Sequence, residues 1–216
     1  MSASTPEAQG MSSAQLGRAS ALLAAEVEGG RVAAASILVA RNGHVVLRAG
    51  YGAPADAVYL LASISKPVNA VALMQQVERG QVSLDDPVLR YLPEFKGAHR
   101  AQVRLRDLLT HTSGLPDMLP QNLALRRVHA PLSAFVQAAC ATPLLYRPRS
   151  DFGYQSMGTL LAGEIVQRVS GQALRDYHQR EIFAVLGMQN SSLGLGGRQI
   201  ADTVLCQTDD TPDMKR

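Results

Sequence analysis

A serine and a lysine three residues apart stand at the start of a predicted helix. Ser63 and Lys66 are followed by an apolar run at helical spacing, which ends at Gly80. Because Pro67 is tolerated only in the first turn of a helix, this helix should begin near Ser63. Positions i and i+3 lie on one helix face, so the hydroxyl and the amine can meet beside free backbone N–H groups. The arrangement suits nucleophilic catalysis, in which a neighbouring base takes the serine proton.

The Ser-x-x-Lys spacing by itself has a second interpretation. With 3 lysines and 16 serines in 216 residues, chance produces roughly 0.2 such matches, so the motif is only a hypothesis. Serine is a favoured helix cap, and a first-turn lysine is usually solvated. The residues around the pair therefore have to decide between a cap and a nucleophile.

The nucleophile segment resembles the active-site helix of the serine β-lactamase and penicillin-binding-protein superfamily, in the sequence Leu61-Ala62-Ser63-Ile64-Ser65-Lys66. It is most similar to the branch of class C β-lactamases, D-aminopeptidases and esterases, and the resemblance runs from about residue 12 to residue 188. The resemblance implies an α/β (α+β) fold, with a helical subdomain beside an antiparallel sheet of which only the first hairpin is evident here. It also implies a serine hydrolase that forms an acyl-enzyme on a small-molecule or peptide substrate, through an ester, amide or β-lactam bond.

A second motif falls where this superfamily carries Tyr-x-Asn. In the family the tyrosine stands beside the nucleophile and shuttles its proton, a role that the resemblance gives to Tyr154. A phenol beside an ammonium group can act as a base because its anion is stabilised. The alternative is a buried aromatic residue with a bonded hydroxyl.

Two residues near Tyr154 depart from the family pattern. Ser156 replaces the asparagine that helps to hold substrate, and Arg149 stands where a glycine often follows Pro148. The sequence therefore favours general acyl transfer over β-lactam specificity.

The segment from Leu108 to Leu115 resembles the family's Leu-Leu-Thr-His-Thr-Ser-Gly-Leu sequence, which lies under the site and shapes it. His111 as a general base for Ser113 is one interpretation. A loop held by bonds from side chains to the backbone explains the same residues, and we favour it.

Composition and charge give little indication of other partners. Of the 216 residues, 46% are hydrophobic and 18% are charged, as in globular proteins. The net charge is +3 and the arginines are scattered, so we expect no nucleic-acid partner. No run approaches the roughly 18 apolar residues of a membrane span, so we expect no membrane partner. Cysteines and histidines lack metal-ligand spacing, and we expect neither a metal nor a cofactor.

The periodicity predicts a series of helices and one hairpin. Asn42-Gly43 is the strongest two-residue turn signal and should join two strands. Helices are predicted over residues 14–28, 105–109, 131–141, 159–169 and 173–186, with a further helix start at Asp86. We expect a disordered tail over residues 1–13 and a single β-lactamase-like domain over residues 14–216. No signal peptide is evident, which favours the cytoplasm, or the periplasm or secretion if the true N-terminus differs.

No Lys-Thr-Gly, Lys-Ser-Gly or His-x-Gly sequence follows Tyr154. In the family, such a strand lies beside the nucleophile and gives the second N–H of the oxyanion hole. Loss of one oxyanion donor costs about 10²–10³ in rate. We therefore expect a truncated chain, or one that needs a second chain to complete the sheet. The alternative function is a catalytically incomplete member that acts as a binding or interaction module.

Overall fold

Two compact units make up the computed structural model, which describes residues 1–206. One unit comprises Met1–Leu60 and the segment from Gly197 onward, and the other comprises Leu61–Gly196. The sequence predicted one domain over residues 14–216, whose last ten residues lie outside the described part. All three predicted catalytic residues, Ser63, Lys66 and Tyr154, belong to the second unit.

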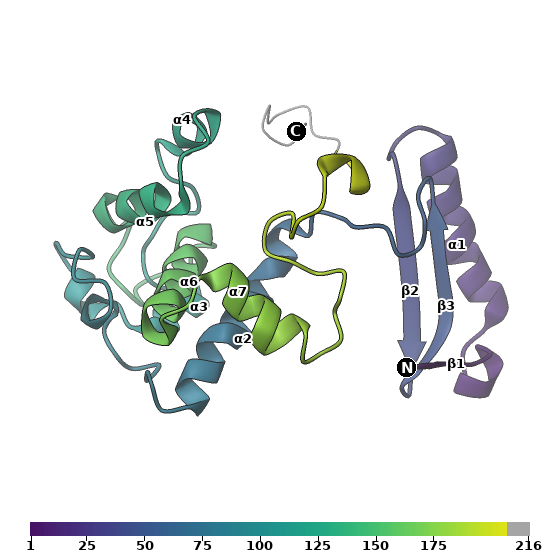
Figure 1. The fold of residues 1–216 in the computed structure, drawn as a ribbon, viewed down its shortest axis with the longest axis horizontal. Coiled ribbons are helices and arrows are strands. Elements are labelled where there is room, and N and C mark those ends of the chain that lie inside the picture. Colours follow the sequence, from purple (N-terminus) through teal and green to yellow (C-terminus); the bar gives the residue numbers. More distant parts are fainter. Residues whose placement is uncertain (207–216) are drawn as a thin grey trace. The chain divides into compact units, whose positions relative to one another are not determined.

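A helix packed against a small sheet forms the first unit (Figure 1). The helix α1 (Ser13–Glu28) contacts β2 (Ala35–Arg41) and β3 (His44–Tyr51), which pair antiparallel. Asn42 and Gly43 join these strands with φ of 52° and 78°. Both angles are positive, as the tight hairpin turn requires, and the predicted hairpin is confirmed.

The N-terminal residues differ from the predicted disordered tail. The strand β1 (Ser2–Ala3) pairs in parallel with β3 (His44–Tyr51), giving the strand order β1-β3-β2. The Glu7 carboxylate accepts bonds of 2.9 Å from both the N–H and the hydroxyl of Ser13. A two-residue strand carries no periodicity, and its partner lies far along the chain, so the local pattern could not predict this pairing.

A helical core forms the second unit. The long helices α2 (Ser65–Glu78) and α6 (Ser156–Ser170) pack against each other, and α3 (Leu105–Leu109) packs against α6. Apolar side chains from all three helices are completely buried at their contacts, including those of Leu73, Leu108, Leu161 and Ile165. Burial of this kind is the main favourable contribution to folding.

Helices α3 and α6 approach closely at a glycine. A Cβ atom on Gly158 would lie 2.7 Å from the carbonyl oxygen of Leu108 and 3.1 Å from the Gln155 side chain. Only a residue without a side chain allows this approach. It brings the start of α6, and with it the Tyr154 segment (Phe152–Gln155), against α3.

The other described helices are mostly short. They are α4 (Asn122–Arg127), α5 (Leu132–Ala141) and α7 (Leu174–His178), which a π-helical turn extends over Gln179–Phe183, with 3-10 helices at Glu7–Gln9, Ala62–Ile64, Val88–Arg90, Arg100–Gln102 and Ile200–Asp202. The predicted helix over residues 173–186 is therefore shorter than expected, and α4 was not predicted. The helix start at Asp86 yields only a 3-10 turn. Within residues 1–206, no helix combines the length and apolarity needed to cross a membrane.

Candidate active site

Ser63 lies in a tight turn that leads directly into α2. The turn is the 3-10 helix Ala62–Ile64, and regular α-helix begins at Ser65, close to the predicted start. In a 3-10 turn, side chains at i and i+3 eclipse, which brings Ser63 and Lys66 onto one side. Ala62 has a φ of 46°, in the left-handed region that non-glycine residues rarely adopt. Such strained conformations cluster at functional sites.

The structure brings together the three predicted catalytic residues. The Lys66 ammonium donates to the Ser63 hydroxyl oxygen at 2.9 Å. The Tyr154 hydroxyl contacts the same Ser63 oxygen at 2.8 Å, and the Lys66 nitrogen lies 4.8 Å from the centre of the Tyr154 ring. The Ser63 oxygen is thus within proton-transfer distance of two groups.

The electrostatic surroundings favour the anionic form of Tyr154. The Lys66 ammonium and the hydrogen bond with Ser63 hold the pKa of the Tyr154 phenol below its ordinary value of 10, while burial and the Asp117 carboxylate act in the opposite direction. The Tyr154 residue is 46% exposed, so its side chain lies at the protein surface. A phenol with a lowered pKa is a better base near neutral pH.

Gln155, the residue after Tyr154, is hydrogen-bonded to the segment that runs from Asp107 to Ser113. Its side chain is completely buried, accepts a 2.6 Å bond from the Ser113 hydroxyl and donates to the Asp107 carbonyl at 3.2 Å. The His111 ring nitrogen Nδ1 accepts from the Gln155 backbone N–H at 3.2 Å. His111 therefore faces the Tyr154 segment, and the buried Ser113 hydroxyl serves the loop, as we favoured.

Ser156 is bonded to a carboxylate that sequence reasoning missed. Its backbone N–H and its hydroxyl both donate to one oxygen of Asp117, at 2.8 and 2.7 Å. Asp117 thereby caps the start of α6, where a negative charge is favourable. Its sequence position carries no signal for this role, because the contact depends on how its loop folds back. A substrate contact by Ser156 remains a prediction.

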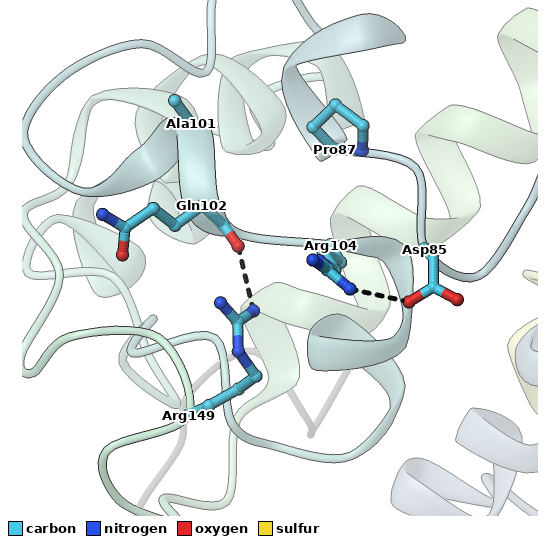
Figure 2. A pocket seen from close by; sticks show the side chains of 6 residues that line it. All are labelled: Asp85, Pro87, Ala101, Gln102, Arg104 and Arg149. Carbon is cyan, nitrogen blue, oxygen red and sulfur yellow. Dashed lines mark hydrogen bonds and ion pairs between the residues drawn. The ribbon is translucent and has the colours of Figure 1, made fainter.

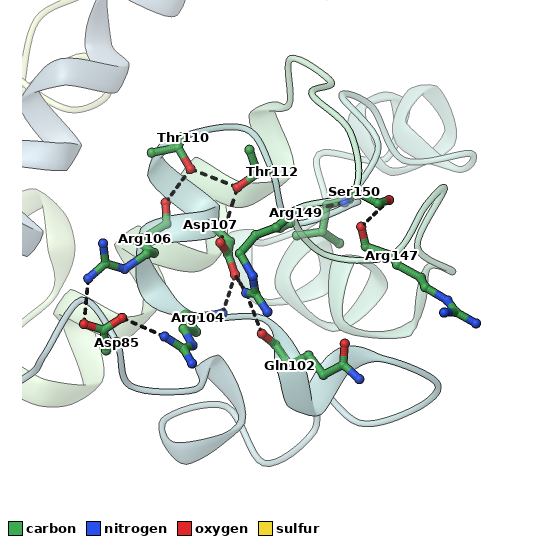
Figure 3. Close-up of polar contacts among 12 residues, drawn as sticks. Asp85, Gln102, Arg104, Arg106, Asp107, Thr110, Thr112, Arg147, Arg149 and Ser150 are labelled. Carbon is green, nitrogen blue, oxygen red and sulfur yellow. Dashed lines mark hydrogen bonds and ion pairs between the residues drawn. The ribbon is translucent and has the colours of Figure 1, made fainter.

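Arg149, the departure from the family's glycine, takes a glycine-like conformation. Its φ is 65°, and its guanidinium donates to the buried carboxylate of Asp107 at 2.5 Å and to the Gln102 carbonyl at 2.9 Å. Figure 3 shows the Arg149 side chain directed toward Asp107 and Gln102, and the Arg147 side chain directed away from them. The ion pair anchors the loop that leads to Tyr154.

A cavity of about 290 Å³ opens beside Arg149 (Figure 2). It is lined by Asp85, Pro87, Ala101, Gln102, Arg104 and Arg149. Arg104 and Arg106 share the Asp85 carboxylate, at 2.9 and 2.6 Å. None of the three predicted catalytic residues lines this cavity. Among residues 1–206, no three His, Cys, Asp or Glu side chains gather into a group that could hold a metal ion.

The sequence matches the family described as Beta-lactamase over residues 19–213. The chain belongs to this family. Solved structures of family relatives have the β-lactamase/transpeptidase fold, which confirms the mixed α/β class that the resemblance of residues 61–66 implied.

The similar proteins include an esterase and an amidase. Protein flp of Staphylococcus aureus (strain N315) is 28% identical, over 77% of this chain and 36% of its own length. Esterase EstB of Burkholderia gladioli is 30% identical, over 74% of this chain and 47% of its own length. D-amino acid amidase of Ochrobactrum anthropi SV3, solved with L-phenylalanine amide, is 26% identical with a TM-score of 0.73, over 85% of this chain and 53% of that one. The chain thus spans about a third to a half of these relatives.

Proposed function

We propose that the chain is a serine hydrolase that transfers an acyl group to Ser63. The observation that supports this is the convergence of Lys66 and Tyr154 on the Ser63 oxygen, at 2.9 and 2.8 Å. A serine hydroxyl needs a neighbouring base, and both groups are within reach of its proton. The family match supports the same reaction type.

In the first step, the Ser63 oxygen attacks the carbonyl carbon of an ester or amide. Tyr154, as phenolate beside the Lys66 ammonium, accepts the Ser63 proton as the new carbon–oxygen bond forms. The proton then passes to the leaving alcohol or amine as the old bond breaks. In the second step, water attacks the acyl carbon and gives one proton to Tyr154. The bond between the acyl carbon and the Ser63 oxygen then breaks, and Tyr154 returns that proton to the Ser63 oxygen as the acid leaves, which restores both Ser63 and the phenolate.

The substrate class that we propose is a small ester or amide. The named relatives include an esterase and a D-amino acid amidase. Ser156, where the family has asparagine, offers a single donor whereas an amide side chain offers two. Because the Ser156 hydroxyl is bonded to Asp117, we expect weak selectivity for the amide of a substrate and better turnover of esters.

The test is covalent labelling of the full chain with a fluorophosphonate, followed by intact mass measurement. We expect one adduct on Ser63, none in Ser63→Ala, and an unchanged adduct in the matched control Ser65→Ala. Circular dichroism of each variant shows whether it is folded. A folded wild-type chain that takes up no label, or that is labelled equally in Ser63→Ala, contradicts the proposal.

A second candidate is a binding module, or a subunit that needs a partner chain. The observation in its favour is that the hydroxyl of Ser156, where the family has asparagine, is already bonded to Asp117 at 2.7 Å. A folded chain with no Ser63 label supports it. Labelling that appears only on addition of a chain bearing the family's Lys-Thr-Gly or His-x-Gly strand would support the partner form.

A further inference from the structure

The His111 side chain is held against the Tyr154 segment (Phe152–Gln155). Its Nδ1 atom accepts the Gln155 N–H at 3.2 Å, and its ring centre lies 4.8 Å from that of Tyr154. The His111 and Phe152 rings also pack edge-to-face, with their centres 5.9 Å apart. The His111 carbonyl accepts the Gly153 N–H at 3.0 Å. One residue thus contacts all four residues of the segment.

The backbone of His111 is itself fixed. Its φ of 60° lies in the left-handed region, which histidine, asparagine and aspartate enter more readily than other non-glycine residues. The Tyr146 hydroxyl donates to the same His111 carbonyl at 3.2 Å. The ring is therefore presented to the Tyr154 segment from a defined position.

The hydrogen bond determines the protonation state of the ring. Because Nδ1 accepts from the Gln155 N–H, the ring is neutral and carries its proton on Nε2. A proton on Nδ1 would face the Gln155 N–H, and the bond would be lost. The loss would free the backbone next to Tyr154.

Charged groups near His111 act in both directions. Lys66 disfavours a second positive charge, whereas the Asp117 carboxylate favours it. Burial and Lys66 together hold the pKa of His111 below its ordinary value of 6.5. Tyr146 is neutral in this range, because burial raises its pKa above the ordinary value of 10, and a phenolate at Tyr154 would favour the charged ring.

We propose that His111 is a positioning residue for Tyr154, and that its protonation releases the Tyr154 segment and lowers the reactivity of Ser63 at acid pH. The effect on reactivity rests on the proposed function. His111 acts through Tyr154 and takes no proton from Ser63. The bond between His111 and Gln155 does not depend on that function and can be measured separately.

Three variants separate the parts of this proposal. His111→Asn keeps an acceptor, suits the left-handed backbone and cannot be protonated. His111→Ala removes the acceptor and the ring. His129→Asn is the matched control, because His129 is exposed and also has a positive φ, of 49°.

The first measurement is an NMR titration of the histidine rings and the Gln155 amide. We expect one ring signal, absent in His111→Asn, that titrates below pH 6.5 with its proton on Nε2 when neutral. The Gln155 amide signal should shift with the same midpoint in the wild type and in His129→Asn, and not in His111→Asn. A ring proton on Nδ1, or a Gln155 amide that ignores the titration, would overturn the positioning role whatever the activity.

The second measurement is the rate of fluorophosphonate labelling between pH 4.5 and 8. We expect wild type and His129→Asn to lose labelling rate at the His111 midpoint, and His111→Asn to lack that step while keeping its neutral rate within about threefold. His111→Ala should label about tenfold more slowly or worse, since a misplacement of about 1 Å costs on the order of 100-fold. Identical pH profiles in wild type and His111→Asn would overturn the acid switch. No labelling at any pH overturns the proposed function and the switch together, and leaves the NMR result to decide the positioning role.

Discussion

Lys66 and Tyr154 are coupled across the Ser63 oxygen. The ammonium both donates to Ser63 and lies 4.8 Å from the Tyr154 ring. It thereby favours the phenolate and disfavours a charged His111 ring. One lysine thus biases two titrating neighbours toward the state that the proposed reaction needs.

Replacing Lys66 should change both titrations in a predictable direction. In Lys66→Met the pKa of Tyr154 should rise, because its anion loses the adjacent cation, and the pKa of His111 should also rise, because a repulsive charge is removed. NMR titration with ring-labelled tyrosine and histidine measures both. Lys96→Met, an exposed lysine outside the site, is the control and should leave both unchanged. A Tyr154 pKa that is unaltered in Lys66→Met would show that the coupling is absent.

The loop that leads to the Tyr154 segment depends on one arginine. Arg149 has a positive φ, and its ion pair at 2.5 Å is with Asp107, which is only 1% exposed. The left-handed conformation costs a non-glycine residue about 1–2 kcal/mol. The contact with a buried carboxylate offsets that cost, because removing one partner leaves the other charge without compensation.

Two substitutions at this position separate strain from charge. Arg149→Ala keeps the backbone strain and loses the ion pair, so it should lower the free energy of unfolding by about 2 kcal/mol. Arg149→Gly loses the same ion pair but relieves the strain, so it should be about 1 kcal/mol more stable than Arg149→Ala. Urea unfolding of both variants measures the difference. Equal stabilities would mean that the left-handed backbone carries no cost here.

The close approach of α6 to α3 predicts opposite effects for one substitution at two helical glycines. Gly158→Ala would place a methyl group 2.7 Å from the Leu108 carbonyl and should lower the free energy of unfolding by about 1–3 kcal/mol. In α1 nothing lies within 4 Å of a Cβ on Gly17, so Gly17→Ala should raise it by about 0.5–1 kcal/mol. Thermal unfolding measures both. A neutral Gly158→Ala variant would show that the two helices can separate at no cost.

One buried and one half-buried histidine link the stability of the whole protein to pH. His178 is 3% exposed, its Nε2 has no hydrogen-bond partner within the described residues, and burial holds its pKa below 6.5. His111 is shifted in the same direction. The unfolded chain therefore binds more protons than the folded chain below pH 6.5, and stability is lost as the pH falls from there toward the folded pKa values.

We expect the free energy of unfolding to drop between pH 6.5 and pH 4.5, by up to about 1.4 kcal/mol per pH unit for each shifted histidine. The carboxylates with lowered pKa values, Glu94 and Glu181 among them, add to the loss of stability only below about pH 5, so the histidine contribution is measured between pH 6.5 and pH 5. His178→Leu should flatten the dependence, and His129→Asn should leave it as it is. Urea unfolding at a series of pH values measures the slopes. A wild-type stability that is constant over this window would contradict the prediction.

Features that depend on neighbours along the chain could be predicted from the amino-acid sequence. Ser63 and Lys66 meet because a helical turn places i and i+3 on one side, and the hairpin forms because Asn42 and Gly43 accept positive φ angles. These are properties of local backbone geometry, and local patterns carry them. Tyr154 was placed beside Ser63 only through the family resemblance, since 91 residues separate the two.

The tertiary structure alone decided the contacts that surround this pair. His111 reaches Tyr154, Asp117 reaches Ser156, and Arg149 reaches Asp107 because α2, α3 and α6 bury their apolar faces together. Burial is non-directional, so a sequence shows which faces are apolar but not which loop side chains their packing brings into contact. The meeting of Ser63 and Lys66 was therefore readable from the chain, and the contacts that surround this pair followed only from the packing of the helices.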